Sequence, residues 1–107
     1  MHAQVYATHG FATLMVNCRG STGYGPEARR RHLQGSGPRR EARDVLAGID
    51  AALAGYAWLD GGRLGVKARS YGGQLADWLI TQTTRFRAAI PTAGISNFVV
   101  SFNYMAY

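Results

Sequence analysis

The residues best suited to chemistry surround Ser70, in the segment Ala68-Arg69-Ser70-Tyr71-Gly72-Gly73. This segment is close to G-x-S-x-G, with Ala68 in place of the first glycine. In that pattern a nucleophilic serine lies on a sharp turn between a strand and a helix, and the next amide, here that of Tyr71, points toward the developing oxyanion. An ordinary serine in a Gly-rich turn fits the pentapeptide equally well. The apolar strand expected before it and the helix expected after it favour the nucleophile.

Other groups that could do chemistry lack the neighbours that the chemistry needs. The segment Gly20-Ser21-Thr22-Gly23-Tyr24-Gly25 has neither the G-K-[ST] ending of a P-loop nor the order G-x-G-x-x-G, so we expect no phosphate site. Cys18 is the only cysteine, and we interpret it as a core or loop residue and not as a nucleophile. The histidines His2, His9 and His32 are scattered, so the sequence predicts neither a metal site nor a cofactor.

Short apolar runs and amphipathic periods alternate along the chain. The apolar runs predict buried parallel strands over residues 12–16, 63–67 and 88–90. Apolar residues at helical spacing predict two helices, with inner faces from Val45 to Tyr56 and from Leu75 to Ile80, and we expect another helix before the first strand. Residues 20–40 are rich in Gly and Arg and predict a long loop. This alternation is typical of an α/β protein with a parallel sheet.

Length, composition and charge limit the class of protein. The chain has 107 residues, 47% of them hydrophobic, so we expect one globular domain. No apolar run approaches the roughly 20 residues of a membrane span and no signal stretch opens the chain, so we expect a cytoplasmic protein that does not bind membranes. The net charge is +6, and a block of arginines lies between Arg29 and Arg43. No aromatic residues interleave with this block, so we favour a solvated segment over nucleic-acid binding.

Nearly the whole chain resembles the prolyl oligopeptidase family, and it is most similar to the acylaminoacyl-peptidase and dipeptidyl-peptidase branch. The similar segments occur in the family's order and at its spacing; they are residues 16–25, 44–51, 63–66, 70–73, 85–89 and 94–98. The resemblance implies an α/β-hydrolase fold and acyl transfer through a covalent acyl-enzyme, with short peptides or simple esters as substrates. It also implies that Ser70 is the nucleophile, that Tyr71 supplies an oxyanion amide and that the segment around Phe98 borders the substrate pocket.

Several residues depart from the family's pattern. Ala68 stands where the family's turn has glycine, and Arg69 places a charge beside the nucleophile, where it either binds an anionic substrate or extends into solvent. After Ser70 the only carboxylate is Asp77 and no histidine follows, although the triad order in this fold is Ser, then Asp or Glu, then His. Phe98 and the other aromatic residues of the last ten positions fit a core as well as a pocket.

The sequence therefore predicts that residues 1–107 form a partial α/β-hydrolase domain with no second domain, in the order strand, helix, strand, nucleophile turn, helix, strand. Such a piece carries the nucleophile without its acid and base, so we expect the isolated chain to be weak or inactive. The alternative is a non-catalytic remnant that serves as an interaction or assembly module. In either case the exposed edges of a three-stranded sheet predict a homo-oligomer or a poorly soluble chain.

Overall fold

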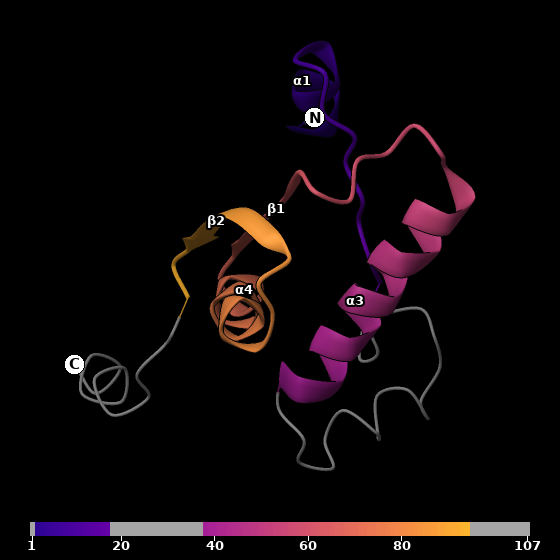
Figure 1. Ribbon diagram of the computed structural model, residues 1–107. Coiled ribbons are helices and arrows are strands. Elements are labelled where there is room, and N and C mark those ends of the chain that lie inside the picture. The colour runs from indigo at the N-terminus through magenta and orange to yellow at the C-terminus, as the bar shows by residue number, and fades with distance from the viewer. Residues whose placement is uncertain (1, 18–37, 95–107) are drawn as a thin grey trace, which may run out of the picture. The chain divides into compact units, whose positions relative to one another are not determined.

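The computed structural model describes residues 2–17 and 38–94. The chain divides into two compact units, Met1–Asp60 and Gly61–Tyr107, which we describe separately. The described elements, in chain order, are α1 (His2–Thr8), α3 (Pro38–Gly55), β1 (Leu64–Arg69), α4 (Tyr71–Gln82) and β2 (Phe86–Thr92) (Figure 1). Within the described ranges, no helix combines the length and the apolar character that crossing a membrane requires.

Helix α1 ends in a glycine turn, and its presence confirms the helix expected before the first predicted strand. Gly10 has φ +80°, a left-handed conformation that glycine adopts without steric cost. The amide of Gly10 donates to the carbonyl of Ala7 at 3.1 Å, and that of Phe11 donates to the carbonyl of Tyr6 at 3.0 Å. The rings of Tyr6 and Phe11 also meet edge to face, with centroids 6.3 Å apart. These bonds and this contact together form a Schellman end, which fixes where the helix stops.

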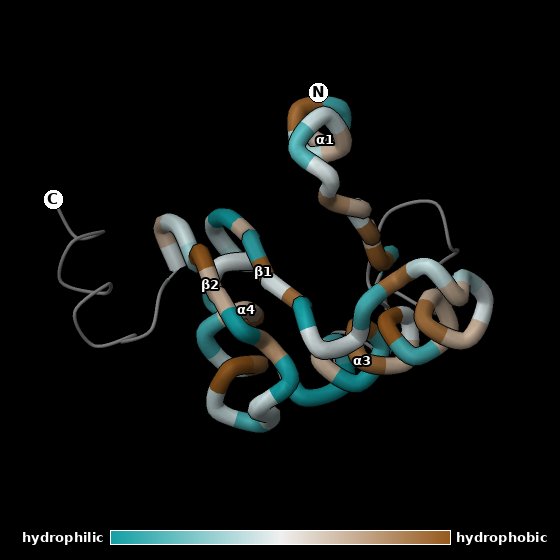
Figure 2. The backbone as a smooth tube through the Cα atoms, turned by 45° about the horizontal axis from the view of Figure 1, so that its top comes forward, coloured by the Kyte–Doolittle hydropathy of each residue, from teal (hydrophilic) through white to brown (hydrophobic). Residues whose placement is uncertain are grey.

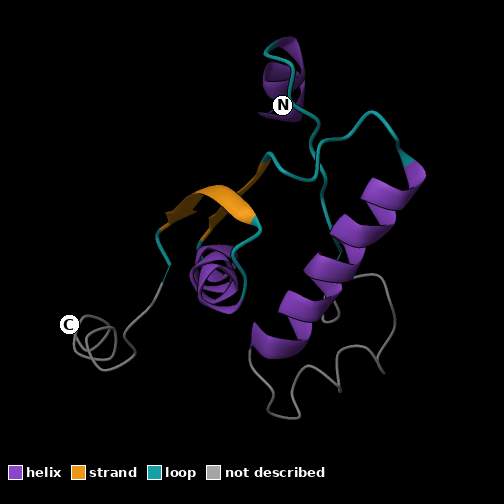
Figure 3. Cartoon of the chain, viewed as in Figure 1, coloured by secondary structure: helices purple, strands orange, loops and turns teal. Residues whose placement is uncertain are grey.

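The strand predicted over residues 12–16 is wrong. Residues 11–17 follow α1 without regular secondary structure and are drawn as a loop in Figure 3. The expected burial is wrong as well, because Leu14 is 50% exposed and Met15 is 81% exposed. A strand is defined by hydrogen bonds to a neighbouring strand, and no described segment pairs with this one. The run has the apolar side chains that are typical of a strand, but it lacks the hydrogen-bonded neighbour that makes a segment a strand.

Helix α3 confirms the predicted amphipathic helix but begins earlier, at Pro38, inside the segment predicted as a loop. Proline suits the first helical position because it has no amide hydrogen to leave unpaired, and Glu41 lies in the first turn, where a negative charge is favourable. Hydrophobic and hydrophilic residues alternate along the helix (Figure 2). On its apolar face Ile49 is buried. A Cβ added to Gly48 would lie 2.8 Å from a methyl group of Val16, so the segment after α1 packs on α3.

In the second unit, two parallel strands form a small sheet with α4 packed against both of them (Figure 1). The register pairs Val66 with Ala89 and Lys67 with Ile90. These strands confirm the strands predicted over residues 63–67 and 88–90, although β1 begins one residue later and ends two residues later, and β2 extends two residues further at each end. The expected burial is wrong, because no residue of either strand is buried and Ile90 is 55% exposed. Inside α4, Ala76 and Leu79 are each 1% exposed, so they form the core of this unit. The described fold is therefore mixed helix and strand with a parallel sheet, as expected for part of an α/β protein.

Candidate active site

Ser70 occupies the junction between β1 and α4, as the sequence predicted. Its backbone has φ 59° and ψ −125°. Within residues 2–17 and 38–94, only Ser70 and Ala93 combine a positive φ with a side chain. A non-glycine residue in such a conformation costs about 1–3 kcal/mol and persists only where the surrounding structure holds it. The turn at Ser70 is therefore sharp and strained.

Backbone hydrogen bonds hold this turn while the side chain of Ser70 takes no part in them. The amide of Ser70 donates to the carbonyl of Thr92, the last residue of β2, at 2.9 Å. The amide of Gln74 donates to the carbonyl of Ser70 at 3.1 Å, which begins the helical bonding of α4. Ser70 occupies the N-cap position, where the hydroxyl oxygen of a serine often accepts a hydrogen bond from a backbone N–H of the first helical turn. Here the hydroxyl makes no such capping bond, and the residue is exposed.

Small residues around the turn allow the helix to approach the strands. A Cβ added to Gly72 would lie 3.2 Å from the Cβ of Ala68, which is a tight contact. A Cβ added to Gly73 would lie 2.7 Å from the carbonyl oxygen of Thr92, which is closer than real Cβ atoms come. Ala68 is thus accommodated at this turn because its neighbour across the turn, Gly72, has no side chain.

The N-terminus of α4 supplies the electrostatic part of the site. The first backbone N–H groups of a helix point out of its N-terminal end, where the helix dipole favours negative charge. Tyr71 is the first residue of α4, and its side chain is 47% exposed. An oxyanion that forms at Ser70 would therefore develop at the positive end of α4. This is the arrangement that the prediction for the Tyr71 amide requires, and that role stays a prediction.

The chain that follows β2 returns to the same place. Ala93 has φ 51°, and this left-handed turn brings Gly94 against the first turns of α4. A Cβ added to Gly94 would lie 2.8 Å from the amide nitrogen of Gln74 and 3.1 Å from Oδ2 of Asp77. Ala93 and Gly94 therefore belong to the surroundings of Ser70.

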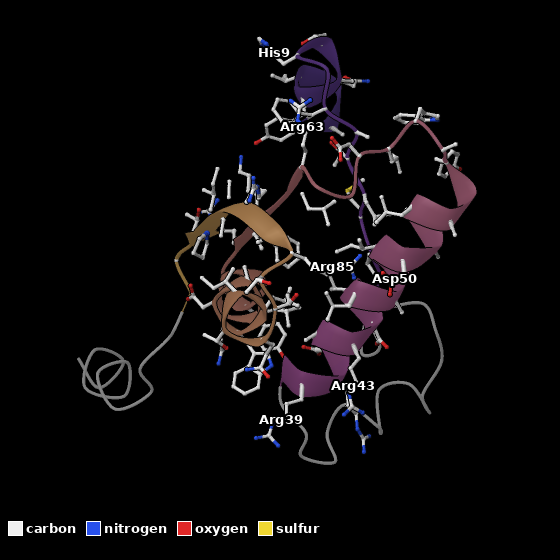
Figure 4. The ribbon with its side chains drawn as sticks, viewed as in Figure 1. His9, Arg39, Arg43, Asp50, Arg63 and Arg85 are labelled. Carbon is white, nitrogen blue, oxygen red and sulfur yellow. The ribbon has the colours of Figure 1, made fainter. Side chains whose placement is uncertain are left out.

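The remaining candidate residues lie elsewhere in the chain. Phe98, Cys18 and His32 fall outside the described residues, as do three of the six arginines of the block, Arg29, Arg30 and Arg31. Of that block, Arg39 and Arg43 are exposed at the start of α3 (Figure 4). His9 follows α1 in the first unit, whereas Ser70 belongs to the second. No group of three or more potential metal ligands occurs among the residues that the structure describes.

Comparison with known proteins decides the family. The profile of the prolyl oligopeptidase family matches residues 1–105. The chain belongs to the prolyl oligopeptidase family. It is also 38% identical over 96 residues to "Uncharacterized peptidase YuxL" of Bacillus subtilis (strain 168), an alignment that covers 90% of this chain and 14% of that protein.

Sequence reasoning missed the contribution of the end of β2 and of the two residues that follow it. Thr92 and Gly94 contact the turn at Ser70 although they lie more than twenty positions away in the sequence. Asp77 was considered only as a triad acid, and its position beside Gly94 was not predicted. One signal was available, because a glycine that closely follows a predicted parallel strand often marks a close approach of two backbones.

Proposed function

We propose that this protein is a serine peptidase and esterase of the prolyl oligopeptidase family with Ser70 as its nucleophile, built on an α/β-hydrolase core. The observation that carries the proposal is the conformation of Ser70. A strained serine at positive φ lies between a parallel strand and a helix N-terminus, and its hydroxyl is not used to cap the helix. Strained backbone of this kind gathers at functional sites, where it places a side chain that a relaxed turn would not present.

The proposed reaction is acyl transfer. The Oγ of Ser70 attacks the carbonyl carbon of a peptide or ester, its proton passes to a general base, and the carbonyl oxygen becomes an oxyanion near the amide of Tyr71. The bond to the leaving group then breaks, the leaving group takes up the proton, and water releases the acyl group from Ser70. All three histidines of this sequence precede Ser70, and we assign the base to none of them.

The proposed substrates are short peptides and simple esters, with the segment around Phe98 bordering the pocket. Without an assigned base, the hydroxyl of Ser70 is a weak nucleophile. In serine proteases, removal of triad members leaves about 10³–10⁴-fold catalysis over water. We therefore expect this chain to hydrolyse an activated nitrophenyl ester slowly and to hydrolyse peptides at a rate too low to measure.

The test compares nitrophenyl ester hydrolysis by the 107-residue chain, by Ser70→Ala and by Thr81→Ala. Thr81→Ala is the matched control because it removes an exposed hydroxyl from the opposite end of the same helix. Mass mapping after treatment with a fluorophosphonate shows which side chain carries the label. We expect slow hydrolysis that Ser70→Ala abolishes and Thr81→Ala preserves, with the label on Ser70. Equal turnover by the chain and by Ser70→Ala, or a label elsewhere, would refute the assignment.

A further inference from the structure

In the described part of the second unit, one hydrogen bond links the strained Ser70 to Thr92, the residue just before the strained Ala93. Ser70 has φ 59° and Ala93 has φ 51°, and the amide of Ser70 donates to the carbonyl of Thr92 at 2.9 Å. That carbonyl belongs to the peptide unit that joins Thr92 to Ala93, and this unit is planar. A change of backbone angles around Ala93 therefore reorients the acceptor that holds Ser70.

The left-handed conformation of Ala93 needs support from its surroundings. Such a conformation is unfavourable for a residue with a side chain, so contacts made by neighbouring residues must offset its cost. Gly94 lies close to the start of α4, because a Cβ placed on it would lie 2.8 Å from Gln74 N, 2.8 Å from Gly73 C and 3.1 Å from Asp77 Oδ2, which leaves no room for a side chain. Two of these three atoms are backbone, and the third belongs to the half-buried side chain of Asp77.

The geometry points to Asp77 as a positioning residue for Ser70, an inference that rests on the proposed role of Ser70 as nucleophile. The Oδ2 atom of Asp77 lies 3.1 Å from the place that a Cβ on Gly94 would take, so the carboxylate limits how Gly94 can move away from the first turns of α4. Gly94 in this place keeps Ala93 left-handed, and Ala93 directs the carbonyl of Thr92 at the amide of Ser70. Asp77 acts through this backbone and takes no part in proton transfer.

The test measures the hydrogen bond directly, by amide hydrogen exchange in Asp77→Ala. We expect exchange of the Ser70 amide to rise about 5- to 100-fold relative to that of the Leu79 amide, the range expected when a strained backbone conformation loses its support. Leu79 lies in the core of α4 and reports on opening of the whole unit. Asp77→Asn keeps a side-chain oxygen and restores most of the protection. Gln82→Ala, at the exposed end of α4, leaves the exchange of the Ser70 amide unchanged.

A second variant keeps the proposal testable if Asp77→Ala alone does not fold. Glycine adopts a positive φ without cost, so adding Ala93→Gly to Asp77→Ala removes the need for the support that Asp77 gives. We expect this double variant to recover protection of the Ser70 amide. If the Ser70 and Leu79 amides change by the same factor in Asp77→Ala, or if Ala93→Gly restores nothing, Asp77 is not a positioning residue.

Fluorophosphonate labelling separates this inference from the proposed function. We expect the fluorophosphonate to label Ser70 more slowly in Asp77→Ala than in the unmodified chain, by a factor similar to the change in amide exchange. If the unmodified chain takes up no label on Ser70, the proposed function fails, and the exchange data still decide whether Asp77 holds the turn.

Discussion

Replacement of Ser70 by glycine and by alanine tests the strain at the turn without any assay of activity. Both substitutions remove the hydroxyl, which makes no capping hydrogen bond, so its loss costs the two variants equally. They differ in the backbone, because φ 59° is unfavourable for alanine and favourable for glycine. The difference in stability between the two variants therefore isolates the strain.

The expected difference combines two opposing effects. Alanine at positive φ keeps a strain of about 1–3 kcal/mol. Glycine releases that strain but costs about 0.5–1 kcal/mol, because the unfolded chain has more conformations to lose. We therefore expect Ser70→Gly to be more stable than Ser70→Ala by about 1 kcal/mol, a shift of about 4–8 °C in Tm for a chain of this size.

Urea unfolding followed by the fluorescence of Trp78, which lies in α4, measures this difference in the same unit once Trp58→Phe has removed the other tryptophan. The matched control is the same pair of substitutions at Thr81, within α4, where glycine should be less stable than alanine by about 1 kcal/mol. The sign of the difference thus reverses between the two positions. If Ser70→Ala is as stable as Ser70→Gly, the turn is not strained, and the structural support for a nucleophile at Ser70 is lost.

The other predictions concern packing and charge. Gly73→Ala places a Cβ 2.7 Å from the last carbonyl of β2, so it should destabilise the fold by about 1–3 kcal/mol, and an unchanged urea midpoint would contradict this contact. Gly48→Ala should stabilise α3 through its helix propensity only in the Val16→Ala background, where the methyl group 2.8 Å from the new Cβ is absent. A double-mutant cycle should therefore give a coupling of about 1 kcal/mol between the two positions. Replacement of the exposed Arg39 and Arg43 by Gln should change the free energy of unfolding by about 0–1 kcal/mol each, and a larger loss in urea unfolding would reveal a network of charges.

The local parts of the fold could be predicted from the sequence because their signals are local. Short apolar runs mark the strands at residues 64–69 and 86–92, and the pattern from Ala68 to Gly73 marks the turn between β1 and α4. The helical periods of α3 and α4 are equally local. Hydrophobic periodicity and turn residues identify elements of this kind without knowledge of their neighbours.

The rest depends on contacts between distant residues. The apolar run at residues 12–16 is typical of a strand, but pairing depends on a neighbour that the pattern does not identify. Nothing in the sequence near Asp77 predicts that its carboxylate lies close to Gly94, seventeen positions later. The two residues come close only because α4 packs against β2. The glycines and arginines of residues 20–40 indicate a loop, so the sequence predicts too late a start for α3, which begins at Pro38.

The contact between Ala68 and Gly72 has a consequence for how such turns evolve. One methyl group fits between the strand and the helix, and the 3.2 Å approach shows that a second would crowd it. The two positions should therefore vary together, with alanine tolerated at either one while glycine occupies the other. A search pattern that demands glycine at both positions passes over chains such as this one. A pattern that demands at least one glycine in the pair would recover them and would still follow the steric limit that the turn imposes.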